Sequence, residues 1–340
     1  MNSIRLAIVV LILVHLGACG GGGGCDSQLL FGKITSCNGD GGSDSSEEFT
    51  AAASQGELVK YKIDKKAMQY SYTIISSAYG LADISRSGSL QYNIIDDTYT
   101  PVGLGAKIAV NSDGLFYGVI KEDFGSGDVA VPVFGVKGIE KSLVKMADNY
   151  NYVSYQCIAS NPCGSQYGSI RVGLKGDWTY CRGGNLSSLA SNCTSSVSGL
   201  GFFDESSKKI VLIDQYGNIV GAAIAYVKNL QKVFIIDLNG GSPLLGKGMI
   251  VASSQSDAPV SMDGIWRYIR LRETGRIVIS GKTLMQYIDG GTNPAPTNFV
   301  VNDPWQGFVT TANGTVALAA GSGMYAARTL DGDFSVGLRK

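Results

Sequence analysis

Seven cysteines and one histidine are the side chains of this 340-residue sequence that most constrain its chemistry. The histidine, His15, lies in an apolar run close to the start, so a chain cut after that run would contain none. Without an imidazole base, a Ser-His-Asp or Cys-His mechanism has no proton acceptor, and zinc sites built on histidine are excluded. The cysteines are Cys19, Cys25, Cys37, Cys157, Cys163, Cys181 and Cys193.

The first residues have the pattern of a secretory signal peptide: Arg5 precedes an apolar run over residues 6–16. That run is about half of the ~20 residues that a membrane-spanning helix needs. Leu16-Gly17-Ala18-Cys19 follows it and resembles the lipobox of bacterial lipoproteins. The resemblance implies cleavage before Cys19, with residues 1–18 removed, and acyl chains such as palmitate on the new amino end. In bacterial lipoproteins, an aspartate after the lipidated cysteine would imply retention in the inner membrane. Gly20 at this position favours the outer membrane, and the sequence does not decide between its periplasmic and its outer face.

A lipid on Cys19 would leave six cysteines, which are enough for three disulfides in an oxidising compartment. Cys25 and Cys37 are expected partners because they stand alone near the start of the chain. For the other four, local pairing joins 157 to 163 and 181 to 193, whereas strand-to-strand pairing joins 157 to 181 and 163 to 193. Local pairing is slightly favoured. No metal site is expected, because no pair of cysteines has the two-residue spacing of thiolate zinc sites.

Residues 19–56 read as a lipid anchor followed by a tether rich in glycine, serine and acidic residues, a composition that cannot bury a core. This glycine-rich stretch resembles the tethers of host-protein-capturing lipoproteins such as the transferrin-binding proteins. That resemblance implies a protein ligand for the folded body.

From residue 57 onward, short apolar runs separated by turn residues predict antiparallel strands. Residues 129–136 are one such strand, and Pro132 suggests that it lies at a sheet edge. Residues 138–148 have helical spacing, and a boundary is placed after them. We therefore expect an all-β protein with two sandwich- or barrel-like domains, over residues 57–148 and 149–340. A single β-propeller is the alternative fold.

Two further patterns concern catalysis and binding. Ser142-Leu143-Val144-Lys145 matches the S-x-x-K motif of penicillin-binding enzymes, but the other motifs of that family are missing, so an amphipathic helix is the preferred interpretation. Aromatic residues on or beside predicted strands could serve either a binding surface or a sheet core. The candidate binding residues are Tyr152, Trp178, Trp266 and Trp305.

The charge balance narrows the class of function. Cleavage before Cys19 removes one basic residue, so 27 basic and 28 acidic residues remain. This near-neutral balance argues against electrostatic binding of nucleic acid. The sequence predicts a lipid-anchored cell-envelope protein of binding or structural type, with a possible protein or glycan ligand, no cofactor and no catalytic residues. The alternative is an envelope hydrolase that cleaves glycans or peptides with paired carboxylates.

Overall fold

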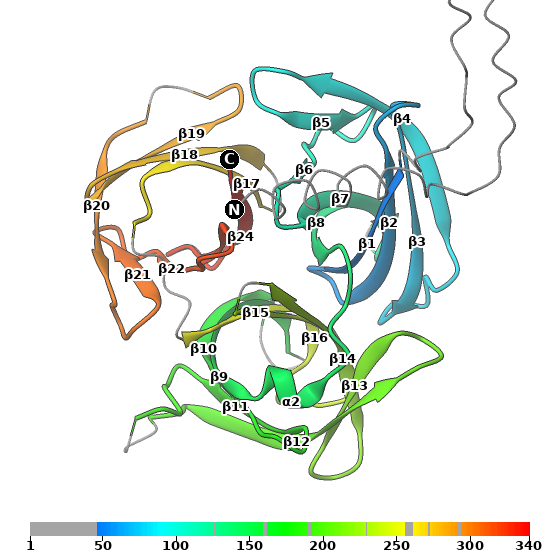
Figure 1. Cartoon of the computed structure of the whole chain (residues 1–340), viewed down its shortest axis with the longest axis vertical. Helices are drawn as coiled ribbons and strands as arrows, with labels where there is room; N and C mark the ends of the chain where they lie inside the picture. Colours follow the sequence, from blue (N-terminus) through cyan, green and yellow to red (C-terminus); the bar gives the residue numbers. More distant parts are fainter. Residues whose placement is uncertain are drawn as a thin grey trace, which may run out of the picture. The chain divides into compact units, whose positions relative to one another are not determined.

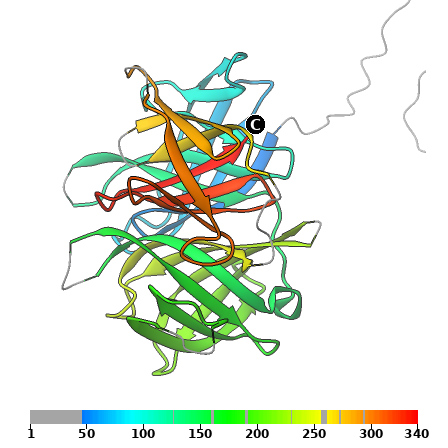
Figure 2. The ribbon, with the colours of Figure 1, turned by 90° about the vertical axis from the view of Figure 1, so that its left-hand side faces the viewer.

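The structure is a computed structural model of the chain. It describes residues 46–340, except for residues 126, 159–161, 189–191, 229, 256–260, 271–272 and 292–293. The predicted signal peptide, Cys19, Cys25, Cys37 and most of the predicted tether lie outside the described residues. The described part belongs to one compact unit that contains three eight-stranded antiparallel sheets (Figures 1 and 2).

The first sheet, barrel 1, has the strand order β5-β4-β3-β2-β1-β8-β7-β6. Its strands are β1 (Ser46–Ala53), β2 (Glu57–Asp64), β3 (Gln69–Ser77), β4 (Ser85–Asn93), β5 (Thr98–Pro101), β6 (Ala109–Val110), β7 (Leu115–Asp123) and β8 (Asp128–Val136). Two backbone hydrogen bonds between Tyr99 and Ile108, of 2.9 and 2.7 Å, bring its edges together, so this barrel is nearly closed.

The second sheet, barrel 2, is a closed barrel in which each strand pairs with its neighbours in sequence and β16 pairs with β9. Its strands are β9 (Asp148–Cys157), β10 (Gly164–Val172), β11 (Asp177–Arg182), β12 (Ser195–Asp204), β13 (Lys209–Asp214), β14 (Ile219–Lys228), β15 (Gln231–Asn239) and β16 (Lys247–Ser254). One helical turn, α2 (Leu143–Met146), precedes it.

The third sheet, barrel 3, closes in the same way through β24 and β17. Its strands are β17 (Gly264–Arg270), β18 (Glu273–Ser280), β19 (Thr283–Ile288), β20 (Thr297–Val301), β21 (Phe308–Thr311), β22 (Val316–Ala319), β23 (Met324–Arg328) and β24 (Phe334–Arg339). No helix in the described part of the chain is both long and apolar enough to cross a membrane.

The predicted all-β fold of antiparallel barrels is confirmed, but its parts are arranged differently. The predicted boundary near residue 148 coincides with the start of β9, and residues 149–340 contain two barrels instead of one domain. Barrel 1 begins at Ser46, inside the predicted tether. β1 has a single β-branched residue, Thr50, and therefore gives a weak strand signal, but its small inward-facing Ala51 and Ala53 pack beside Phe49.

Two local predictions need correction. The predicted helix over 138–148 is reduced to α2, since the backbone is extended again from Ala147. β8 lies between β1 and β7, so Pro132 is not in an edge strand. The proline is tolerated because the pairing of β8 with β1 ends at Val133, just where the missing N–H of Pro132 would have to donate.

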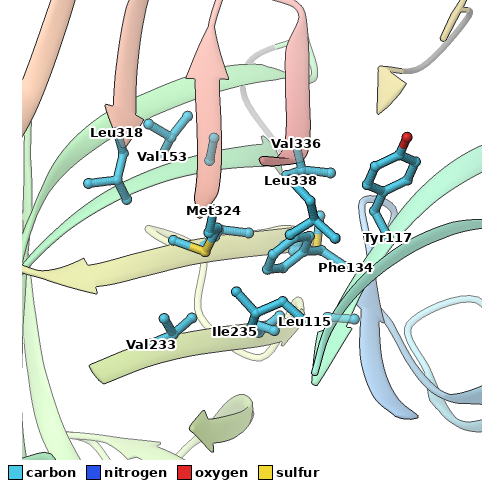
Figure 3. Packing of buried hydrophobic residues seen from close by; sticks show 14 of the residues in the cluster. Leu115, Tyr117, Phe134, Val153, Val233, Ile235, Leu318, Met324, Val336 and Leu338 are labelled. Carbon is cyan, nitrogen blue, oxygen red and sulfur yellow. The ribbon is translucent and has the colours of Figure 1, made fainter. Parts of the chain in front are cut away.

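Alternation along the strands produces two kinds of core. In β7, Phe116 and Ile120 point into barrel 1, whereas Leu115, Tyr117 and Val119 point outward. The outward apolar faces of all three barrels pack into one cluster, here called the central core. Figure 3 shows it where β7, β15, β23 and β24 meet. In these strands neither face meets water. Their sequences are therefore apolar at nearly every position instead of alternating between apolar and polar residues.

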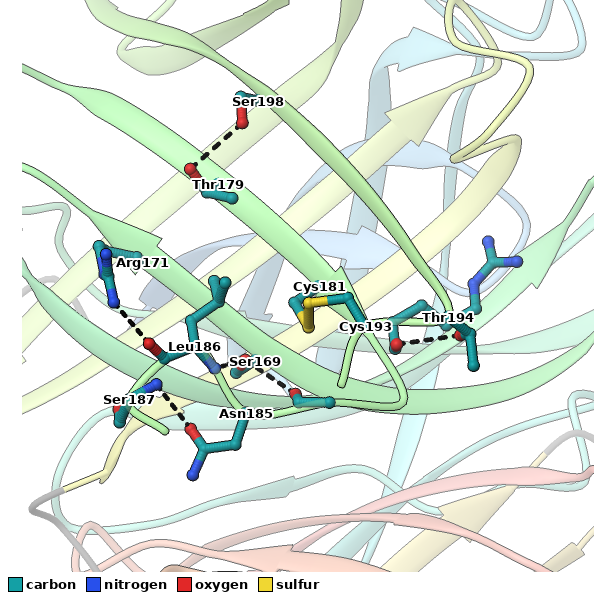
Figure 4. The surroundings of a disulfide bond; sticks show 12 residues. Ser169, Arg171, Thr179, Cys181, Asn185, Leu186, Ser187, Cys193, Thr194 and Ser198 are labelled. Carbon is teal, nitrogen blue, oxygen red and sulfur yellow. Dashed lines mark hydrogen bonds between the residues drawn. A yellow bond between two sulfur atoms is a disulfide. The ribbon is translucent and has the colours of Figure 1, made fainter. Parts of the chain in front are cut away.

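The described cysteines form two disulfides, Cys157–Cys163 and Cys181–Cys193. Local pairing is therefore confirmed for these four. Cys181 lies in β11, and residues 184–187, which follow that strand, lie beside Ser169 on the outside of barrel 2 (Figure 4). Within that segment, Leu186 accepts a hydrogen bond of 2.5 Å from Arg171, and its N–H donates to the Ser169 hydroxyl.

Candidate functional site

The three barrels differ in how completely side chains fill their interiors. In barrel 1, the ring of Phe116 stacks on Phe49 and meets Tyr61 at a tilt, with both pairs of centroids 4.8 Å apart. In barrel 2, Tyr152 stacks on Tyr180 at 4.8 Å, and a void of only about 40 Å³ remains. Barrel 3 contains a cavity of about 260 Å³. Eight strands enclose a space that side chains can just fill or that can hold one small ligand.

Small inward-facing residues explain why barrel 3 is hollow. Ala317 of β22 and Ala327 of β23 are directly paired and both line the cavity. Across the barrel, the wall is made of Ile277 and Ile279, which are not large enough to reach them. The equivalent space in barrel 2 is occupied by Tyr150, Tyr152, Trp178, Tyr180 and Phe234.

Aromatic and aliphatic side chains form the deep wall of the cavity. Trp266 is almost completely buried there, and its indole N–H donates to the carbonyl of Met262 at 2.9 Å. The ring of Tyr325 meets Trp266 edge-on, with centroids 6.3 Å apart. Phe299 and Val309 continue this surface. Because the indole N–H is already paired, the indole offers the cavity its apolar surface.

Gln286 and Arg270 connect the lining of the cavity to a polar network. The Gln286 amide donates to the Tyr268 hydroxyl at 2.9 Å, and that hydroxyl donates to Glu273 at 3.0 Å. Glu273 also pairs with the Arg270 guanidinium at 2.6 Å, and Asp333 lies 3.7 Å from the same nitrogen. These partners fix the orientation of each side chain.

Burial sets the ionisation of this network. It raises the pKa of the Tyr268 and Tyr325 hydroxyls above the ordinary range, so both stay neutral hydrogen-bonding groups. Burial also raises the pKa of Asp333, while Arg270 opposes that rise. Arg270 is the only charged residue among the described residues that line the cavity, and two carboxylates already neutralise it.

The residues singled out from the sequence lie in three different places. Trp266 lines the cavity of barrel 3. Tyr152 and Trp178 are buried in the filled interior of barrel 2. Trp305 packs on Phe308 at the edge of the central core, with ring centroids 5.1 Å apart, and donates to Asn151. The structure therefore brings none of the other three to the cavity with Trp266.

Sequence reasoning missed Gln286, Arg270, Phe299 and Tyr325, which complete the cavity. Their alternation along β17, β19, β20 and β23 marks them as inward-facing, but it does not reveal which barrel is hollow. Ala317 and Ala327 are small, but only the structure shows that they are paired on adjacent strands and face the same cavity.

The features that could have supported catalysis have structural partners. Ser142 caps α2 by accepting from the backbone N–H of Lys145, and the Lys145 ammonium pairs with Glu140 at 3.0 Å. Glu273 and Asp333, beside the cavity, both face Arg270. Within the described ranges, no three residues of the types histidine, cysteine, aspartate and glutamate are grouped so that they could hold a metal ion.

Comparison with protein-family models and with curated proteins found no match to this chain, so the functional argument rests on the cavity and on the sequence.

Proposed function

We propose that this chain is a lipid-anchored cell-envelope binding protein in which barrel 3 holds a small, mainly apolar ligand. One observation carries the proposal: barrel 3 has a cavity of about 260 Å³, while the neighbouring barrel 2 keeps only about 40 Å³. Binding pockets are typically concave and apolar, with a few polar groups that fix the orientation of the ligand. The walls of barrel 3 have this composition.

Barrels 1 and 2 act in this proposal as a scaffold. Their outward faces contribute Leu115, Phe134, Val233 and Ile235 to the central core, against which Phe334 and Val336 of barrel 3 pack. A barrel with a hollow interior has lost internal packing. The shared core compensates for that loss from outside.

Binding is better supported than hydrolysis. Carboxylate-based hydrolysis needs two carboxyl groups that face the substrate, one of them able to give up a proton. Glu273 and Asp333 instead face Arg270, and Glu273 also accepts from Tyr268.

The anchor in this proposal rests on the lipobox that ends at Cys19, and Gly20 favours the outer membrane. The two disulfides of barrel 2 support an oxidising compartment, since such bonds persist outside the cytosol. A lipid anchor would leave the described part of the chain outside the bilayer and its cavity open to envelope solutes.

The cavity is tested by titrating the folded protein with 1-aminonaphthalene, whose fluorescence rises and shifts to the blue in apolar surroundings. We expect one saturable site with a Kd on the order of 10 µM, as the usual affinity per atom implies for a molecule of this size. Ala317→Phe, which fills the cavity, should abolish the signal, whereas Val300→Thr, on the exposed face of β20, should preserve it. No saturable binding, or equal binding by Ala317→Phe, would overturn the proposal.

The anchor is tested by mass spectrometry of the mature amino end and by phase separation in a detergent. An acylated Cys19 that partitions into the detergent phase is expected, and Cys19→Ser should move the protein to the aqueous phase. An unmodified Cys19 in the wild-type protein would contradict the anchor without affecting the cavity proposal. Protease treatment of intact cells then distinguishes the two faces of the outer membrane, because only a surface-exposed body is removed.

A further inference from the structure

The wall of barrel 3 has an opening between β19 and β20. These strands pair at only two positions, Thr283 with Asn298 and Leu284 with Thr297. β19 continues to Ile288 and remains paired on its other side, where Gln286 lies opposite Ile277 of β18. Within the described part of the chain, no β20 residue pairs with residues 285–288. On that side, the Ile288 carbonyl accepts from the N–H of Gly291 at 3.0 Å instead of from a residue of β20.

Two prolines account for the opening. Pro296 directly precedes the first residue of β20, and Pro294 lies two positions before it. Proline locks φ at about −65°, which differs from the φ of a paired antiparallel strand, so β20 does not continue as a regular strand along β19 through these residues. The gap is thus encoded in the sequence.

The opening leads into the cavity. Gln286 and Ile288 on one side, and Pro294 and Ala295 on the other, all line the cavity. Ile288 has 41% of its surface exposed even though it belongs to this lining. A ligand could therefore enter between β19 and β20 without unpairing any strand.

The lining favours an uncharged ligand. Its single charge, on Arg270, is already opposed by Glu273 and Asp333. The other polar residues that line the cavity are neutral: Gln286, Thr297, Thr311, Asn313, Thr315, Thr329 and Ser335. Burying a charge without a partner is far more costly than burying a hydroxyl or amide that finds a hydrogen bond. An anion or a cation would find no partner here.

The volume and the aromatic wall favour a flat ring. A cavity of about 150 Å³ accommodates benzene, and drug-sized ligands use roughly 300–1,000 Å³. The value of about 260 Å³ lies between these and fits one or two fused rings. Trp266, Phe299 and Tyr325 offer surfaces on which such rings pack in offset or edge-on geometry.

We propose that barrel 3 selects a neutral molecule of one or two fused rings, which enters between β19 and β20. The apolar body of this ligand packs on Trp266 and Phe299, and its polar substituent lies beside Gln286. This inference rests on the proposed binding function and specifies its ligand class and route of entry.

The ligand class is tested by calorimetry at pH 7 with three naphthalenes of matched size: neutral 2-naphthol, anionic 2-naphthoate and cationic 2-naphthylmethylammonium. We expect 2-naphthol to bind at least ten times more tightly than either ion. Equal or tighter binding of an ion would overturn the inference and leave the binding function standing. If 1-aminonaphthalene bound and none of the three did, the inference would also fail. If none of the four probes bound, the proposed function itself would fail.

The route of entry is tested by stopped-flow association of 1-aminonaphthalene. Replacing Pro294 and Pro296 by valine frees the φ angles of this segment so that β20 can extend along β19, which should slow association at least tenfold as the gap closes. Ala295→Trp obstructs the same opening by bulk and provides the test if the valine variant does not fold. Val300→Thr is the control and should associate at the wild-type rate. An unchanged association rate in a folded gap variant would exclude entry by this route.

Discussion

The indole N–H of Trp305 donates a 2.7 Å hydrogen bond to the side-chain oxygen of Asn151, which has no exposed surface. The Asn151 amide nitrogen in turn donates to the carbonyl of Gln306 at 2.7 Å. Asn151 belongs to β9 of barrel 2, while Trp305 and Gln306 precede β21 of barrel 3. One buried amide therefore joins the ligand-binding barrel to its scaffold, beside the apolar contacts of the central core.

Asn151→Ala should destabilise the fold by about 1–2 kcal/mol, because it removes the partly buried hydrogen bonds that Asn151 makes with Trp305, Gln306 and Gln255. Urea denaturation measures this change. Asn149→Ala, two residues earlier on the same strand and only partly buried, should cost less than about 1 kcal/mol. Equal losses from the two variants would show that the Asn151 bonds add nothing beyond the packing of the strand.

Stability should fall as the pH rises from 5 to 8, owing to two buried carboxyl groups. Burial and the nearby Asp237 raise the pKa of Glu57 to about 8, and burial raises the pKa of Asp237 to about 8 against the opposing charge of Lys209. Unfolded carboxyl groups titrate near pH 4, so between about pH 4 and 8 the folded chain binds more protons than the unfolded chain. The free energy of unfolding therefore decreases with pH over this window and levels off above pH 8.

The measurement is the melting temperature of the wild-type protein and of Glu57→Gln combined with Asp237→Asn, each at pH 5 and pH 8. The double variant should lose most of the pH dependence and be the more stable protein at pH 8. Glu48→Gln changes an exposed ion pair with Lys60 and serves as the control. Groups with a lowered pKa, such as Glu47, affect stability only at more acidic pH and do not interfere. An unaltered pH dependence in the double variant would assign it to other groups.

Matched alanines distinguish the hollow barrel from a filled one. Ala327 lines the cavity of barrel 3, and Ala225 is packed in the core of barrel 2. Ala327→Leu should stabilise the protein by up to about 2 kcal/mol, since the added carbons enter empty apolar space. Ala225→Leu should cost about 1–3 kcal/mol through overpacking. Urea denaturation of both variants shows whether each substitution raises or lowers the free energy of unfolding. Destabilisation of similar size in both would argue against a hollow interior of barrel 3 in solution.

Those parts of the fold that depend on residues close together in the sequence were predictable. Short apolar runs separated by turn residues correctly indicated antiparallel strands, and short spacing correctly favoured local disulfides. Closure of the barrels was not predictable, because it depends on pairs such as Tyr152 with Ala252 that lie a hundred residues apart. Strands that are buried on both faces, such as β7, do not alternate between apolar and polar residues. Their sequences therefore do not show which side chains face the barrel interior.

The site was less predictable than the fold. Trp266 was chosen because it is aromatic and lies on a strand, and the same reasoning chose Trp305, which instead joins two barrels. The difference lies in the neighbours that each indole meets in space. A cavity results from the summed volumes of inward side chains on eight strands, and small residues such as Ala317 reveal it only once the strand register is known.

The most direct test is a crystal structure of the protein soaked with 2-bromonaphthalene, in which the anomalous signal of bromine marks the ligand without interpretation of its shape. The predicted result is one dominant bromine peak inside barrel 3, between Trp266, Phe299 and Ala317. Peaks found only outside barrel 3, or an empty barrel at a concentration that saturates the site in solution, would contradict the assignment of this cavity as the binding site.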